Sequence, residues 1–491
     1  MPQKTSLANH SCGNHQSSRL KTRRCESSRS FSLVWKELNV FVRIPTAELK
    51  AAICNLISLG EDIIPHGVVY QKLLYEIIPY MNQTIELHLT GMTPTGQAIG
   101  RYNGRVIFVQ YALPGEQVKA QIVHERREYA VGKLLEVISP SPMRMQPRCA
   151  HFGDCGGCEW QHITTAMQIQ YKTQAVREQL KRIGKLDNVD VLECIASPLQ
   201  YEYRNHTQFI VTGAGELGYH KANSRDVVPI TECPILSPLL ESYISRGVEN
   251  KTLPIVKSLA IANLDPAQEL HLRCGENTGE ISIAMETHIG QYEILAGANP
   301  FHEIIHEHTF TISAGSFFQV NTGAAQLLVE QVLIALQPQS HESVLELYCG
   351  VGLFTLPICE RAKYVLAVES SAPATSDARS NLAGHSNATI VTDNVSHWLT
   401  SNAIDAQAWD AIVLDPPRAG VDHKSLLSIL RIQAHRIVYV SCDPATLARD
   451  AKIICNNGYQ LIRVQPLDMF PQTHHVETVA VFMRLAHVET Q

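Results

Sequence analysis

The chain has 491 residues, enough for about two to four domains, and its 45% hydrophobic and 18% charged content is typical of a globular protein. No apolar run reaches membrane-spanning length, so we expect a cytoplasmic protein without a membrane partner. The net charge is −6, but residues 101–185 hold thirteen Lys or Arg against seven Asp or Glu, which indicates either one face for a polyanion or scattered solvated charge.

Residues 1–80 are predicted to form an N-terminal extension that is partly disordered and has no assigned function. Residues 1–36 are rich in Ser and Arg, poor in acids and without periodicity. Apolar runs between residues 45 and 80 indicate one or two helices, but no chemistry. Met81 opens the first segment whose pattern predicts a defined fold.

Residues 81–139 are predicted to form a small β-barrel. Four short segments have strand-like composition, with a glycine-marked turn from Gly96 to Gly100; these segments are Thr84–Leu89, Arg105–Val109, Glu116–Ile122 and Tyr129–Ile138. Several short strands at this spacing favour a barrel of the OB type, and small barrels with basic loops often bind RNA. A structural β module without a ligand is the alternative.

Residues 140–310 are predicted to form an α+β middle domain that opens with clustered cysteines. Cys149, Cys155 and Cys158 have the spacing C-x5-C-x2-C, and Cys233 supplies a fourth thiol. Four thiolates suit a [4Fe–4S] cluster, and the glycine pair 156–157 lets the backbone approach it closely. Zinc bound by four cysteines and clustered free cysteines are the alternatives, and uneven cysteine spacing favours a reducing compartment over a disulfide scaffold.

A helix with basic positions is predicted after the cysteine cluster, over Ile163–Ile183. These basic positions are Lys172, Arg177, Lys181 and Arg182. From Tyr203 to Pro229 the pattern returns to strands with glycine-rich turns.

Residues 311–491 are predicted to form a doubly wound α/β domain of the Rossmann-like type. A helix over Thr322–Leu336 precedes a strand over Ser343–Tyr348, a glycine turn, a helix over Leu353–Ala362 and a second strand that ends in Glu369. This is a nucleoside-binding βαβ unit, with the acid positioned for ribose hydroxyls. Because the turn lacks a third glycine, S-adenosylmethionine is favoured over a pyrophosphate cofactor.

Two later strands end in residues that could carry chemistry. Ala411–Leu414 is followed by Asp415-Pro416-Pro417-Arg418, in which two prolines fix a carboxylate at the sheet edge. Ile437–Val440 is followed by Cys442 and then by a helix over Thr446–Cys455. A thiolate at that edge can attack an electrophilic carbon, although a small core residue is the usual fate of a cysteine.

These motifs together resemble the RNA uracil-5-methyltransferase family from Met81 to the C-terminus. The resemblance rests on the four cysteines, on Phe318-Gln319-Val320-Asn321, on Tyr348-Cys349-Gly350-Val351-Gly352, on Asp415-Pro416-Pro417-Arg418, on Ser441-Cys442-Asp443-Pro444 and on the stretch from Pro471 to Glu477. It implies a TRAM domain, which is a small RNA-binding barrel, and an enzyme that uses S-adenosylmethionine. The barrel and cysteines are more similar to the members that act on 23S ribosomal RNA than to those that act on transfer RNA.

The resemblance also implies the roles of individual residues. Cys442 is the expected nucleophile and Glu477 the expected proton acceptor, although a surface acid at a strand start is the alternative for Glu477. The expected S-adenosylmethionine contacts are Gln319, Tyr348, Glu369, Asp415 and Asn394. Some members have an Asn where this chain has Leu353, so no contact is predicted there. We expect a monomer with an RNA substrate; a noncatalytic RNA-binding iron–sulfur protein and a transfer RNA methyltransferase are the alternative functions.

Elementary chemistry agrees with these implied roles. Carbon 5 of uracil is a poor nucleophile, but addition of a thiolate at carbon 6 turns it into an enolate carbon that can accept a methyl group. A base must then remove the carbon-5 proton so that the thiol can leave. The scheme requires one Cys, one carboxylate, a methyl donor and groups that stabilise the enolate.

Overall fold

The computed structural model describes residues 82–212, 216–222, 224–249, 269–288, 290–401 and 408–485. These residues belong to one compact unit, Tyr80–Gln491. The predicted N-terminal extension, with its predicted disorder and helices, lies outside the described residues. Within the described ranges, no helix is long and apolar enough to cross a membrane.

Five strands close into a barrel in the order β1-β2-β3-β5-β4, which confirms the predicted small barrel. They are β1 (Thr84–Met92), β2 (Ala98–Tyr102), β3 (Arg105–Val109), β4 (Gln117–Glu125) and β5 (Tyr129–Ser139). Alternate residues of β1, including Ile85, Leu87 and Leu89, point into the barrel core.

One detail of the predicted barrel is wrong. The turn expected from Gly96 to Gly100 ends earlier, because Gly100 lies within β2 and pairs with Leu89 of β1. A Cβ at position 100 would lie 2.8 Å from the carbonyl oxygen of His88. Gly100 therefore permits a close approach of two strands, a use of glycine that composition cannot distinguish from a turn.

The predicted middle domain contains an antiparallel sheet in the order β11-β10-β9-β6-β7-β8. Its strands are β6 (His206–Val211), β7 (Leu217–His220), β8 (Val227–Pro229), β9 (Glu269–Cys274), β10 (Ile281–His288) and β11 (Gln291–Gly297). Leu240 and Ile244 of α5 (Pro238–Glu249) pack on this sheet. Strands and a packed helix are the α+β arrangement that the sequence predicted, and a separate hairpin follows, β12 (Phe301–Ile305) and β13 (His308–Ile312).

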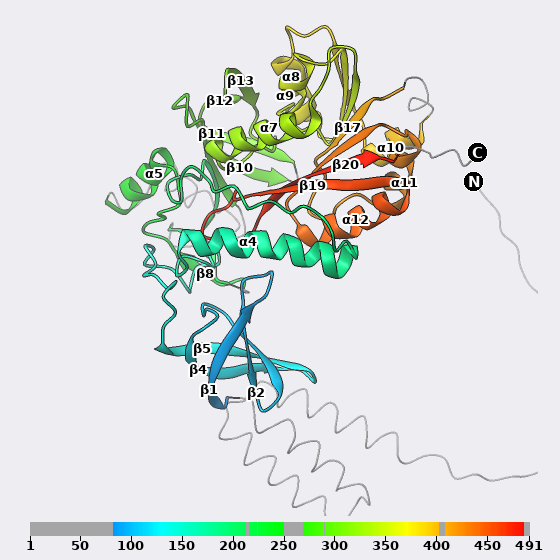
Figure 1. Cartoon of the computed structure of the whole chain (residues 1–491). Helices are drawn as coiled ribbons and strands as arrows, with labels where there is room; N and C mark the ends of the chain where they lie inside the picture. Colours follow the sequence, from blue (N-terminus) through cyan, green and yellow to red (C-terminus); the bar gives the residue numbers. More distant parts are fainter. Residues whose placement is uncertain are drawn as a thin grey trace, which may run out of the picture. The chain divides into compact units, whose positions relative to one another are not determined.

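A seven-stranded sheet in the order β16-β15-β14-β17-β18-β20-β19 forms the last part of the chain. Figure 1 labels β17, β19 and β20 of this sheet. Five strands are parallel, namely β14 (Ser343–Leu347), β15 (Tyr364–Glu369), β16 (Ala388–Thr392), β17 (Ala411–Leu414) and β18 (Arg436–Ser441). β20 (Glu477–Arg484) pairs antiparallel with β18 and with β19 (Tyr459–Leu467). This sheet confirms the predicted doubly wound domain.

Helices cover both faces of this sheet. One face packs against α7 (Thr322–Leu336), α8 (Thr355–Cys359) and α9 (Ala372–Asn381). The other packs against α4 (Thr165–Gln179), α10 (Val395–Thr400), α11 (His423–Arg431) and α12 (Pro444–Asn456). α8 is shorter than predicted because Leu353 and Phe354 belong to the glycine turn, and the helix predicted over Ile163–Ile183 ends in a π-helical turn, η1 (Leu180–Gly184).

Candidate active site and cysteine pocket

Strand pairing places Cys442 and Glu477 opposite each other. Ser441 at the end of β18 pairs with Thr478 of β20, so the residue after Ser441 lies across from the residue before Thr478. Cys442 is half-buried, between the end of β18 and Asp443, which caps α12 by accepting hydrogen bonds from Ala445 N and Thr446 N. Glu477 is 4% exposed. The alternative of a surface acid at a strand start is therefore wrong for Glu477.

Charged neighbours act on the Cys442 thiol in opposite directions. Burial and the negative charge of Glu477 together raise the pKa of Cys442, to about 11. The Arg418 guanidinium lowers the same pKa, whereas Asp415 raises it. Cys442, Glu477 and Asp415 thus come together at one sheet edge, and Arg418 supplies the neighbouring positive charge.

The two carboxyl groups beside Cys442 are both poised to hold a proton. Burial, together with the negative charge of Glu369, raises the pKa of Asp415 to about 7. Burial also raises the pKa of Glu477 well above its usual range, with Asp415 adding to the effect and Arg418 opposing it. Both carboxyl groups therefore take up a proton more readily than an ordinary acid, and the charge of Asp415 disfavours ionisation of Glu477.

The sequence predicted no role for Arg418 beyond its place in the motif Asp415-Pro416-Pro417-Arg418. In the structure the side chain of Arg418 is exposed, and its Nη2 lies 3.2 Å from His475 Nδ1. His475 is two residues before Glu477, and burial together with the charges of His474 and Arg418 lowers its pKa to about 3. Arg418 thus contacts His475, and its positive charge lowers the pKa of Glu477. In the sequence, only the position of Arg418 directly after the paired prolines indicated that this cation lies near the predicted base.

The glycine turn after β14 meets the acid that ends β15. Gly350 N donates to Glu369 Oε2 at 3.2 Å, and Ser371 N donates to Glu369 Oε1 at 2.7 Å. Tyr348 has a φ of 67°, a conformation that non-glycine residues rarely adopt and that is often found at functional sites. A Cβ on Gly350 would meet no atom within 4 Å, so open space lies over the turn. The turn and the acid fit a nucleoside-containing cofactor.

The other predicted cofactor contacts lie on neighbouring segments. Asn394 follows β16, and its Oδ1 caps α10 by accepting from Ser396 N at 2.9 Å. Gln319 is buried directly before α7, and its carbonyl oxygen accepts from Asn205 Nδ2 at 3.1 Å. Asn394 lies two residues after Thr392, which is opposite Glu369 in the β15–β16 ladder.

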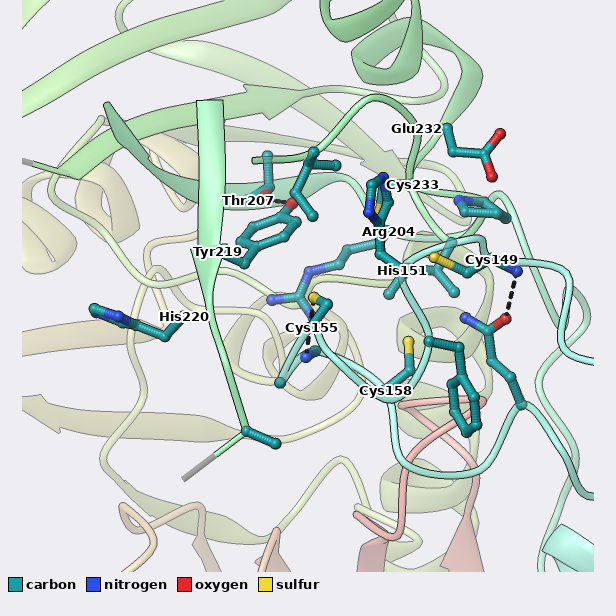
Figure 2. Close-up of a pocket in the computed structure, with 18 of the residues that line it drawn as sticks. Cys149, His151, Cys155, Cys158, Arg204, Thr207, Tyr219, His220, Glu232 and Cys233 are labelled. Atoms are coloured by element: carbon teal, nitrogen blue, oxygen red, sulfur yellow. Dashed lines mark hydrogen bonds between the residues drawn. The ribbon is translucent and has the colours of Figure 1, made fainter. Parts of the chain in front are cut away.

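The four predicted metal-binding cysteines line one pocket of about 340 Å³ (Figure 2). Cys149 N donates to Gln161 Oε1 at 3.0 Å, and Gly157 N lies 3.4 Å from Cys155 Sγ. Cys233 comes from a segment distant in sequence, and its backbone N donates to Glu241 Oε2 at 3.1 Å. Burial raises the pKa of all four thiols, that of Cys233 to about 12.

The pocket fits a sulfur-ligated metal group in the chemistry of its donors. Four thiols surround one space, and the backbone of Gly156 lies against His220, whose carbonyl oxygen accepts from Gly156 N at 2.9 Å. Among the described residues, no three His, Cys, Asp or Glu side chains converge closely enough to share a single metal ion.

Comparisons with known proteins decide the family. The profile described as tRNA (Uracil-5-)-methyltransferase matches residues 303–485, and the TRAM domain profile matches residues 80–135. The 23S rRNA (uracil(1939)-C(5))-methyltransferase RlmD of Pectobacterium atrosepticum is 32% identical over 429 residues, 83% of this chain and 94% of that protein. The chain belongs to the RNA uracil-5-methyltransferase family. It is an S-adenosylmethionine-dependent enzyme with a TRAM domain.

Two further relatives agree with this assignment. An uncharacterized RNA methyltransferase of Thermosynechococcus vestitus is 34% identical over 443 residues, 81% of this methyltransferase and 97% of that protein. The crystal structure of Pyrococcus abyssi tRNA (uracil-54, C5)-methyltransferase in complex with S-adenosyl-L-homocysteine has a TM-score of 0.64 and 24% identity. It covers 81% of this chain and 100% of its own, which supports the fold.

Proposed function

We propose that this methyltransferase modifies carbon 5 of a uridine in 23S ribosomal RNA through a covalent intermediate on Cys442. The observation that carries the proposal is the placement of Cys442 and Glu477 opposite each other across β18 and β20. A nucleophile and a buried carboxyl group on one sheet edge are what addition and elimination at adjacent carbons require.

In the proposed reaction, Cys442 Sγ bonds to carbon 6 of the uracil, and electron density moves through carbon 5 to oxygen 4. S-Adenosylmethionine, when bound, supplies the methyl group and leaves as S-adenosylhomocysteine. Glu477 then takes the carbon-5 proton, the carbon 5–carbon 6 double bond re-forms, and the carbon–sulfur bond breaks. The target base must leave any stack to reach Cys442.

The environment of Glu477 supports a role as base. A carboxylate with a raised pKa is a stronger proton acceptor than an ordinary one, provided that it is ionised when needed. Burial and the negative charge of Asp415 raise the pKa of Glu477, so that Glu477 holds a proton strongly once it has taken one. The positive charge of Arg418 beside Cys442 can offset negative charge that develops on the substrate.

The residues around the glycine turn are proposed to hold the methyl donor. Glu369 is positioned for ribose hydroxyls, because its carboxylate already faces the turn through Gly350 N. Tyr348 and Asp415 line the same edge, with Gln319 and Asn394 on the neighbouring segments.

Ribosomal RNA is proposed as the substrate because RlmD of Pectobacterium atrosepticum matches nearly its whole length to this chain. The similar Pyrococcus abyssi structure is described as a transfer RNA methyltransferase, so transfer RNA is the second candidate. Mapping 5-methyluridine in both RNA classes from a deletion strain separates the two. Loss of the mark from transfer RNA alone would contradict the ribosomal assignment.

The cysteine pocket is proposed to hold a [4Fe–4S] cluster through Cys149, Cys155, Cys158 and Cys233. The four thiols around one pocket support this proposal. Purified protein is expected to be brown and to contain about four iron atoms per chain. Elemental analysis that found stoichiometric zinc and no visible absorbance would reject the iron–sulfur assignment.

The covalent mechanism gives Cys442 and Glu477 opposite signatures. Cys442→Ala should bind RNA without forming an adduct, because it has no nucleophile. Glu477→Gln should accumulate an enzyme–RNA species that carries the methyl group, because elimination stalls. A denaturing gel with labelled RNA measures both, and RNA with 5-fluorouridine should trap the parent enzyme. Methylation by Cys442→Ala, or the absence of both traps, would contradict the mechanism.

A further inference from the structure

One buried polar face of α4 has no part in the function proposed so far. Gln168 and Lys172 are four residues apart, so they project from the same face of the helix, and both are 0% exposed. Lys172 forms an ion pair with the fully buried Asp468 and donates to the carbonyl oxygen of Phe470 at 3.0 Å. Lys172 is therefore fixed to the turn after β19, not to solvent or to RNA.

Gln168 contacts two separate chain segments. Its Nε2 lies 3.1 Å from Gln472 Oε1, and its Oε1 accepts from Gln472 N at 3.0 Å. The same Nε2 lies 3.2 Å from the carbonyl oxygen of Trp160 and 2.9 Å from that of Ile163. One buried amide thus joins the segment after Cys158 to the turn before Glu477.

Gln472 is the point at which these contacts meet. Its φ is 69°, and its carbonyl oxygen accepts from Glu159 N at 3.1 Å and from Trp160 N at 2.9 Å. Its Nε2 donates to the carbonyl oxygen of Gln200 at 3.1 Å. A left-handed glutamine is strained, so these hydrogen bonds are what keep the turn in its conformation.

Burying the Lys172–Asp468 ion pair costs free energy, which indicates that the buried polar face of α4 does more than fill the core. An apolar pair of the same volume at positions 172 and 468 would often be as stabilising, because both charges must be taken out of water. The ion pair adds directional bonds to the turn that precedes Glu477. Asp468 and Phe470 lie at the start of this turn, and Gln472 lies five residues before Glu477.

We propose that Gln168 and Lys172 are positioning residues that hold the turn from Asp468 to Gln472, and through it Glu477, for removal of the carbon-5 proton. Through Trp160 and Ile163, the same Gln168 amide links the cysteine pocket to this step. The inference rests on the proposed covalent mechanism, because it assigns α4 to the elimination half of that reaction and not to addition.

The test is Gln168→Met in the full-length enzyme, which keeps the length of the side chain and removes its hydrogen bonds. Release of methylated RNA should slow by as much as about 100-fold, the scale expected when a catalytic group is misplaced by about 1 Å. The methylated adduct should accumulate on a denaturing gel. Adduct formation with 5-fluorouridine RNA should keep the parent rate, because Cys442 is untouched. Gln174→Met is the matched control, since Gln174 lies on the exposed side of α4.

A positioning role slows release of the methylated RNA and leaves the rate of adduct formation unchanged, whereas a general structural role slows both steps. Equal loss of both steps in Gln168→Met, or parent-like release from a folded variant, overturns the inference. If Gln168→Met does not fold, Gln472→Gly decides: glycine accepts the positive φ, and only the side-chain bonds are lost. Slower release with normal addition supports the inference, and parent-like release overturns it. If the parent enzyme gives no adduct with 5-fluorouridine RNA, the covalent mechanism itself fails.

Discussion

At the scale of single residues, the active edge gathers ionisable groups that oppose one another. Burial raises the pKa of Cys442 and of Glu477, so neither is in its reactive form at neutral pH without help. Arg418 is the cation that lowers both pKa values. Replacing the exposed Arg418 is therefore the simplest way to change the reactivity of this site.

Replacing Arg418 should shift the pH dependence of the reaction. In Arg418→Gln the pKa values of Cys442 and Glu477 rise further, so less thiolate and less carboxylate are present at a given pH. The rising limb of the rate should move to higher pH by at most about one unit, and adduct formation with 5-fluorouridine RNA at pH 7 should slow by up to about tenfold. Solvent screening of the exposed Arg418 makes this an upper bound. A shift to lower pH, or the same shift in Arg431→Gln, would contradict the assignment.

At the scale of elements, sequence pattern predicted the regular parts and missed long-range pairing. β17 and α7 have the predicted bounds, and β15 ends at Glu369 as predicted, because apolar periodicity and glycine turns mark these elements locally. Lys172 was predicted only as a basic position of a helix. It is buried against Asp468, and because that partner lies 296 residues away, no local pattern of the sequence could show the pairing. The burial of Glu477 likewise depends on strand register, which no local pattern of the sequence encodes.

Two glycines of the barrel provide a matched test of one element contact. Gly96 has a φ of +82°, and a Cβ there would lie 2.3 Å from Trp160 Nε1, whereas Gly104 has a φ of +81° and open space around it. Both alanine variants suffer backbone strain, but only Gly96→Ala must displace a buried tryptophan. Gly96→Ala should be less stable than Gly104→Ala by about 1–3 kcal/mol in chemical unfolding. Equal stability would mean that the barrel turn does not pack on Trp160.

At the scale of the whole molecule, the barrel, the cysteine pocket and the active edge meet at one short segment. A Cβ on Gly96 of the barrel would lie within 3.4 Å of His474, and Trp160 N donates to the carbonyl oxygen of Gln472. His474 and Gln472 both belong to the turn before Glu477. The barrel, the segment after Cys158 and the turn before Glu477 are therefore joined by direct contacts.

The barrel's cations should account for part of the RNA affinity. Arg126 and Arg127 are exposed in the turn between β4 and β5, and Lys133 is exposed on β5. If each contacts a phosphate, changing all three to Gln removes about two to three released counterions. The slope of log affinity against log salt should become shallower by that amount, and RNA binding should weaken most at low salt.

A matched variant makes this prediction decisive. Lys424, Arg431 and Lys452 are exposed cations on α11 and α12, so changing them to Gln alters the net charge equally without touching the barrel. Filter binding over a range of salt concentrations should give the parent slope for this control and a shallower slope for the barrel variant. S-Adenosylmethionine binding should be unchanged in both, because neither set lies at the glycine turn. Equal slopes for the two variants would mean that the barrel is structural and that RNA is held elsewhere.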